Sequence, residues 1–178
     1  MSDENTVNPT LQMRHNRKSY MDVKEPSAVG FKLMGEGFTN LSDSLGAKEY
    51  SRKYIHMQSE ISDVIGYAPS KSYSLDVLSG DPVVDDIKYI TDNELVGVDT
   101  HRDIVTYDEY DVHTTSGQNP VTYYDAYKRT YAVIPDGAAD GTEALIITGS
   151  FKAVSDKTNG YFIPSTQAFS TTVPGSAG

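Results

Sequence analysis

Hydrophobic side chains recur at every second position along most of this chain. That spacing is typical of strands with two unlike faces, because successive side chains of a strand point to opposite sides. The run at 102–112 alternates most strictly, and 123–134 is the longest and richest in tyrosine. The segments with this pattern are 31–38, 48–61, 72–78, 102–112, 123–134, 142–154 and a broken strand at 161–173. We therefore predict about seven strands.

One segment, at about 82–95, has the spacing of a helix. Asp81 can accept a hydrogen bond from a first-turn amide, and Pro82 suits the first helical position, where no amide hydrogen is needed. Three apolar residues recur at helical spacing and predict a buried face: Val83, Ile87 and Ile90. The sequence thus predicts a mainly β fold, a β-sandwich or barrel with one flanking α-helix.

The two ends of the chain are polar and predict extended arms. We expect an N-terminal arm over 1–27, one domain over 28–173 and a flexible C-terminal tail over 174–178. We expect the arm and the tail to become ordered only on assembly. The N-terminus has no pattern of a secretory signal, and no apolar run is long enough to span a membrane, so we expect synthesis in the cytoplasm.

Charge is distributed unevenly. The 178 residues have a formal net charge of −10 and contain no cysteine. Residues 61–118 hold three basic and twelve acidic side chains, a net charge of −9. This excess argues against tight binding of nucleic acid, which needs lysine and arginine to displace counterions from phosphates. The lack of cysteine excludes disulfides and thiolate metal sites.

No pattern in the sequence indicates catalysis. The four histidines have no metal-pair spacing, and neither a nucleophile elbow nor a phosphate-binding loop is present. The acidic run at 108–111 lacks the glycine and ligand spacing of a calcium loop, so we read it as a solvated strand face. We therefore predict that the protein is not an enzyme and has no catalytic, cofactor-binding or metal-binding residues.

Surface for self-association is more prominent. Residues 39–47 are of turn-forming types, and we interpret 35–47 as a long loop between subunits. Its apolar members are Phe38, Leu41 and Leu45. Exposed strand edges pair with other chains unless they are blocked, and the thirteen tyrosines suit broad contact surfaces.

The order of four short segments resembles the major tail tube proteins of siphophages that infect Gram-positive bacteria. These segments are Tyr-Met-Asp-Val at 20–23, Leu-Met-Gly-Glu-Gly-Phe at 33–38, Lys-Tyr-Ile at 53–55 leading to Gly-Tyr-Ala-Pro-Ser at 66–70, and Asp-Pro-Val at 81–83. They span about half of the chain. The second half resembles the family only in its strand pattern.

The resemblance implies hexameric rings, stacked around a tape measure protein and closed by tail-end proteins, in a virion tail assembled in the host cytoplasm. Double-stranded DNA would pass through the channel without tight binding, and no membrane is involved. Contractile-tail and type VI secretion tubes share the implied fold. Two other functions stay open: a capsid-decoration or pilin-like sandwich, and a carbohydrate- or ligand-binding sandwich. The second would use clustered aromatic side chains, for which the candidates are Tyr123, Tyr124, Tyr127 and Tyr131.

The strand at 102–112 gives the most specific expectation. Ile104 and its alternate neighbours form the more apolar face and should pack on the core, with Asp108 at an edge or paired. The other face should contact water. The resemblance implies an acidic channel wall, so we expect three residues of that face to line the lumen: Asp103, Glu109 and Asp111.

Overall fold

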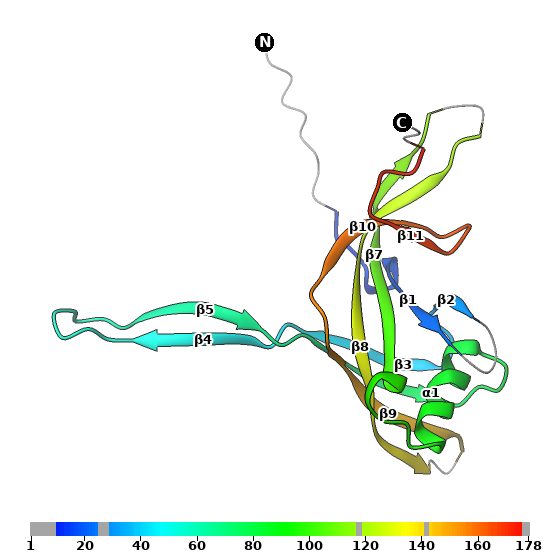
Figure 1. Ribbon diagram of the computed structural model, residues 1–178, viewed down its shortest axis with the longest axis horizontal. Helices are drawn as coiled ribbons and strands as arrows, with labels where there is room; N and C mark the ends of the chain where they lie inside the picture. Colours follow the sequence, from blue (N-terminus) through cyan, green and yellow to red (C-terminus); the bar gives the residue numbers. More distant parts are fainter. Residues whose placement is uncertain (1–9, 25–28, 117–118, 141–142, 176–178) are drawn as a thin grey trace.

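The computed structural model describes residues 10–24, 29–116, 119–140 and 143–175, and these form a mainly antiparallel β structure with one helix (Figure 1). The helix α1 spans Pro82–Asp92, and two 3-10 turns span Arg14–Asn16 and Gly97–Thr100. The strands are β1 Arg17–Val23, β2 Gly30–Leu33, β3 Phe38–Ser44, β4 Ala47–Arg52, β5 Ile61–Tyr67, β6 Ser70–Asp76, β7 His101–Thr114, β8 Thr122–Asp140, β9 Leu145–Ala153, β10 Thr158–Ile163 and β11 Ala168–Ser170. The prediction of a mainly β fold with a flanking helix is confirmed.

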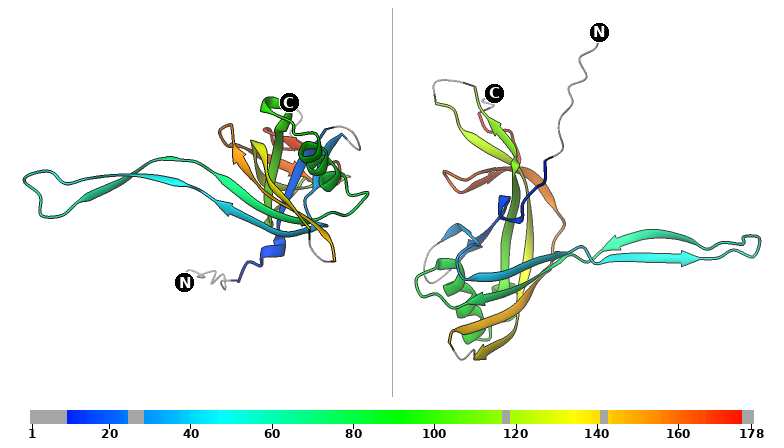
Figure 2. Two further views of the ribbon diagram at one scale, coloured as in Figure 1. Left: turned by 90° about the horizontal axis from the view of Figure 1, so that it is seen from below. Right: turned by 180° about the vertical axis from the view of Figure 1, so that it is seen from behind.

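One large sheet organises the domain. Its strands follow the order β2-β1-β7-β8-β9-β6-β3, and β10 joins it through β8 while pairing with β11. β4 and β5 form a separate two-stranded ribbon that projects from the rest of the molecule (Figures 1 and 2). Two strands, β2 and β3, therefore end the sheet order and leave edges open to pairing.

The main core lies between the sheet and α1. The side chain of Asp81 accepts hydrogen bonds from the amides of Val83 and Val84, at 3.0 and 2.9 Å, so the helix begins where the sequence predicts. The three residues of the predicted helical face are fully buried: Val83, Ile87 and Ile90. They pack with side chains from five strands, among them Met21, Tyr73, Leu75, Ile104 and Phe151.

A buried ion pair fastens α1 to β7. Arg102 donates from Nε and Nη2 to the two carboxylate oxygens of Asp86, at 2.6 and 2.8 Å, and its Nη1 donates to two backbone carbonyls. Both side chains are almost completely buried. Since nearly all of their charge is matched by partners, the helix can lie on the sheet with two charged groups in its interface.

A second, smaller core lies on the opposite face of the sheet, under β10 and β11. It contains Tyr20, Val105, Tyr107, Ala126 and Phe162. Aromatic rings dominate it, with centroids of Tyr20 and Tyr107 4.7 and 5.6 Å from that of Phe162. The strand β7 thus has apolar contacts on both faces over its first half.

Three expectations about the placement of strands and loops are wrong. The segment 39–47 is not a loop, because most of it belongs to β3, which pairs with β6. Residues 17–23 do not belong to an arm but form β1 inside the sheet, between β2 and β7. The segment 48–61 is not one strand: it contains β4, a turn and the first residue of β5. Of the predicted termini, 1–9, 25–27 and 176–178 lie outside the described residues.

Candidate functional site

The most prominent surface feature is the projecting arm, which we define as residues 47–67. It consists of β4 and β5 with a connecting turn, and it extends the β3–β6 pair away from the domain (Figures 1 and 2). The arm exposes many large apolar side chains to water: Tyr50, Tyr54, Ile55, Ile61, Val64, Ile65 and Tyr67. A two-stranded ribbon on its own is marginally stable in water. Apolar residues spread over such a ribbon indicate that another surface covers it.

The root of the arm is tightly built. Gly46 has φ of +54°, a conformation that favours glycine, and an added Cβ would collide with the backbone oxygen of Ala68. The amide of Ala68 donates to the carbonyl of Gly46 at 3.0 Å, so the ladder is continued from the β3–β6 pair towards the arm. One step inside the domain, the buried Lys71 ammonium contacts Asp43 at 2.5 Å. The arm therefore leaves the domain in a fixed local geometry.

The three apolar residues predicted to contact other subunits have different positions. Phe38 and Leu41 lie on β3 and pack against the main core. Leu45 is 67% exposed at the root of the arm. Of the three, Leu45 is the one whose side chain is available for contact. The apolar residues of the arm were missed, because their alternation was read as that of a sheet strand.

The acidic residues predicted to line a channel are also separated. Asp103 accepts a hydrogen bond from Thr130 Oγ1 at 2.6 Å and lies 3.3 Å from the ammonium of Lys128. Glu109 lies 3.8 Å from the Lys18 ammonium. Asp111 is exposed on the second half of β7. The expectation that the whole face meets water is wrong, since Val105 and Tyr107 on that face are buried under β10 and β11.

A change of register explains part of this separation. Tyr107 pairs with Ala126 on β8, but Val112 pairs with Tyr124, so three extra residues of β7 leave the ladder between them. Such a bulge interrupts the alternation of faces. Asp108 lies in this stretch and is paired, as the sequence predicts. The guanidinium of Arg17 donates to both of its carboxylate oxygens at 2.8 Å, and this contact lowers the pKa of Asp108.

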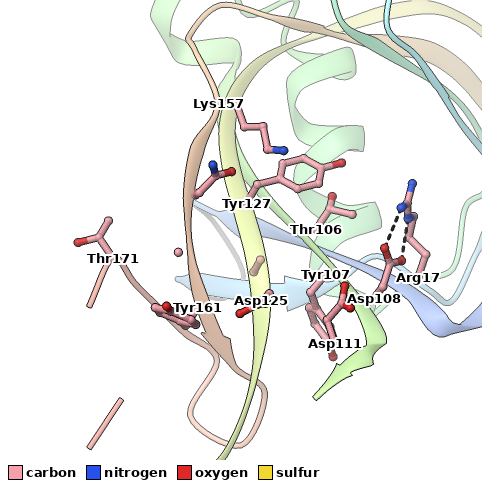
Figure 3. A pocket seen from close by; sticks show the side chains of 13 residues that line it. Arg17, Thr106, Tyr107, Asp108, Asp111, Asp125, Tyr127, Lys157, Tyr161 and Thr171 are labelled. Carbon is pink, nitrogen blue, oxygen red and sulfur yellow. Dashed lines mark hydrogen bonds and ion pairs between the residues drawn. The ribbon is translucent and has the colours of Figure 1, made fainter. Parts of the chain in front are cut away.

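Around this bulge the surface forms an open hollow of about 560 Å³ (Figure 3). Three carboxylates line it, from Asp108, Asp111 and Asp125. The Lys157 ammonium lies 4.6 Å from the ring centroid of Tyr127 at the same hollow. Among the residues that the structure describes, no group of three or more histidine, aspartate or glutamate side chains is arranged to hold a metal ion.

The tyrosines considered for sugar binding do not form one site. Tyr131 is buried in the main core, and Tyr124 stacks on Tyr107 in the second core. Tyr123 stacks on His113 at 5.2 Å. Since the four rings are distributed over different surroundings, they offer no common platform for a sugar ring. In the described part of the chain, no helix has the length and hydrophobicity needed to cross a membrane.

No family model matches the sequence, and no curated protein matches it. A comparison with solved structures does find similar chains. A structure of the SPP1 tail tube, from solid-state NMR and cryo-electron microscopy, superposes with a TM-score of 0.54 at 12% sequence identity, covering 88% of this chain and 83% of that chain. A chain in the six-fold symmetrised cryo-electron microscopy structure of the anti-feeding prophage baseplate gives a TM-score of 0.47 at 12% identity, over 85% of this chain and 96% of that chain.

At this level of identity, the likeness to the SPP1 tail tube shows a shared fold. The chain therefore has the fold of a phage tail tube protein, as its sequence predicts. A fold by itself does not define a function. What the protein does is argued next from the surfaces described above.

Proposed function

We propose that this protein is the repeating subunit of a viral tail tube, built as hexameric rings that stack into a conduit for genome delivery. One observation carries the proposal: a domain with the tail tube fold projects a long apolar ribbon that the domain itself does not cover. Such a ribbon suits contact with another copy, because apolar side chains that stay exposed to water do not stabilise a single chain. The resemblance of four sequence segments to siphophage tail tube proteins supports the same conclusion.

Each open surface has a role in this proposal. The arm contacts a subunit of the adjacent ring, with Leu45 at its root as part of the contact. The open edges of β2 and β3 pair with neighbouring subunits, since unpaired strand edges readily bind other strands. The tape measure protein fills the lumen before DNA does, and tail-end proteins close the tube. The assembled tail belongs to the virion of a phage that infects Gram-positive bacteria, after assembly in the host cytoplasm.

For the channel wall, Glu109 and Asp111 are the favoured residues. Asp103 contacts both Lys128, at 3.3 Å, and Thr130, at 2.6 Å, and this reduces its contribution to the surface potential more than the single 3.8 Å contact with Lys18 reduces that of Glu109. An acidic wall repels DNA phosphates and keeps the polymer from binding during transit, whereas lysine at the same positions attracts it. We expect the substitutions Glu109→Lys and Asp111→Lys to permit tubes but to slow DNA ejection.

Electron microscopy of the purified protein tests the proposal directly. We expect rings or tubes with a central hole at high protein concentration, and rings that do not stack into tubes after Ile61→Ser, Val64→Ser and Ile65→Ser are combined. These three residues are exposed on the arm. The matched control combines serine substitutions at Leu78, Val154 and Val173, which are exposed outside the arm. A wild-type protein that stays monomeric at all concentrations contradicts the proposal.

A further inference from the structure

The turn after α1 holds two valines out in water. In this segment, residues 93–99, Val96 and Val98 are 77% and 72% exposed. We call it the valine loop. Glu94 and Gly97 have φ of +49° and +62°, both in the left-handed region. A non-glycine residue in that region is uncommon and costs free energy, so the surrounding structure must hold the loop in this shape.

Several contacts do hold it. The side chain of Leu95 packs against the main core, and Thr100 Oγ1 donates to the carbonyl of Gly97 at 2.8 Å. Nη1 of the buried Arg102 donates to the carbonyl of Asp99, also at 2.8 Å. The loop is therefore anchored at three points and presents its valines on a rigid support. Rigid apolar groups lose little conformational entropy on binding, which favours their use as contact residues.

A groove elsewhere on the domain has the complementary character. It has a volume of about 630 Å³ and runs between the start of β1 and the edge strand β3. We call it the basic groove and define it by Arg14, His15, Lys18, Leu33, Met34 and Phe38. Its lining combines the apolar side chains of Leu33, Met34 and Phe38 with the basic side chains of Arg14, His15 and Lys18, and Lys18 lies 3.8 Å from Glu109. Arg14 donates to two backbone carbonyls and, within the described chain, forms no salt bridge, so its charge is not neutralised by a carboxylate contact.

The charges of the two surfaces match. Glu94 and Asp99 are the exposed acids of the valine loop, and neither forms a salt bridge with a residue that the structure describes. The arm is the other apolar projection, but its three basic and three acidic side chains give it no net charge. Complementary charge therefore favours the valine loop over the arm as the occupant of the basic groove.

The two surfaces lie apart in one molecule. The valine loop leads into β7 at His101, whereas Leu33 of the groove pairs with Tyr20 of β1, and Tyr20 pairs with Val105 of β7. Four residues of extended strand along β7, roughly 13 Å at about 3.3 Å per residue, and two strand spacings of about 4.8 Å across the sheet separate these points. When a projection and a groove lie on different parts of one subunit, copies of that subunit bind head to tail. Such a chain of copies closes into a ring when the rotation from one copy to the next divides evenly into a full turn.

We propose that the valine loop of each subunit inserts into the basic groove of its neighbour in the same ring. Val96 and Val98 cover the exposed side chain of Leu33, and Glu94 and Asp99 face the basic side chains of the groove, above all Arg14. This inference rests on the proposed function, because it assigns the contact within a ring, while the arm serves contacts between rings.

Cross-linking tests the contact in assembled protein, and the absence of native cysteine leaves a clean background. The variant Leu33→Cys/Val98→Cys is assembled, treated with a short bismaleimide and run on a denaturing gel. We expect a ladder of species that ends at six subunits. The matched control Leu33→Cys/Val64→Cys, with its second cysteine on the arm, should give no such ladder. A ladder that continues past six overturns the assignment to one ring.

Charge reversal gives a second test that does not depend on cross-linker geometry. The loop variant Glu94→Lys/Asp99→Lys and the groove variant His15→Glu/Lys18→Glu should each associate about 100-fold more weakly than the wild type in sedimentation velocity. Mixed together, they should recover ring formation, because the intact groove meets the intact loop and the lysine-bearing loop meets the glutamate-bearing groove, each with opposite charge. Rings of normal stability from either variant alone overturn the inference but leave the proposed function standing. A wild-type monomer contradicts the proposed function itself.

Discussion

Removing the arm should separate assembly from folding. The perturbation replaces residues 47–67 with Asn-Gly. Gly46 and Ala68 are already joined by a backbone hydrogen bond, so a two-residue hairpin turn fits between them. The β3–β6 pair is retained, and so is the contact between Lys71 and Asp43.

The structure sets the magnitude. None of the buried hydrophobic residues lies between 47 and 67, so excision removes no core packing. Shortening the connection from 21 residues to two lowers the entropy cost of closing it by at most about 2 kcal/mol, at about 0.6 kcal/mol per doubling of length. The free energy of unfolding should therefore stay the same or rise by up to about 2 kcal/mol.

Two assays check the two halves of this prediction. Urea unfolding followed by far-ultraviolet circular dichroism measures stability, and electron microscopy at high protein concentration measures assembly. We expect a folded protein that forms no stacked tube. A loss of more than about 2 kcal/mol would show that the arm supports the monomer fold, and tubes of normal length would refute its role between rings.

Three further outcomes follow from single contacts. Asp86→Ala leaves the buried Arg102 charge unpaired, so it should lower the free energy of unfolding, measured by urea titration, by about 3–5 kcal/mol. Adding Arg102→Met to that variant should recover much of the loss. Equal stability of the single and the double variant would contradict this reasoning. Asp108→Asn should destabilise the protein at pH 7 by less than about 1 kcal/mol, because Arg17 is partly exposed. Arg17 lowers the pKa of Asp108 in the folded state, so the stabilisation from this pair is present above the unfolded pKa of about 4 and is lost as the pH falls through the folded-state pKa. The urea unfolding curves of the wild type and of Asp108→Asn should therefore converge in acid. Gly149→Ala should lower the melting temperature by about 4–10 °C, because the new Cβ would lie 2.5 Å from both the backbone oxygen of Ile134 and the Tyr73 hydroxyl. An unchanged melting temperature would show that the sheet can shift at this position.

The sequence predicts local features of this fold well. The start of α1 follows from Asp81 and Pro82, whose effects act within one turn of the helix. The buried face of the helix follows in the same way from its spacing. The pairing of Asp108 was also expected, since a carboxylate on the more apolar face of a strand needs a partner.

Long-range arrangement is what the sequence could not provide. Val105 and Tyr107 alternate with buried neighbours, and nothing nearby shows that β10 and β11 return to cover their face. The turn of the arm, at 53–60, contains no glycine or proline, so the usual marks of a hairpin are missing. The basic groove joins the segment before β1 to β3, and the valine loop follows α1. The complementarity of these two surfaces becomes visible only when the fold places them on one molecule.

In the proposed tube, the isolation of the arm from the core has a consequence for how related tubes diverge. Substitutions on the arm leave the stability of the monomer almost unchanged, so selection acts on them through the receiving surface of another subunit. The two surfaces should consequently change together, while the core changes independently. Two related subunits whose arms fit only their own receiving surfaces could then be made in one doubly infected cell. Each would fold normally and assemble only with its own kind into a separate tube.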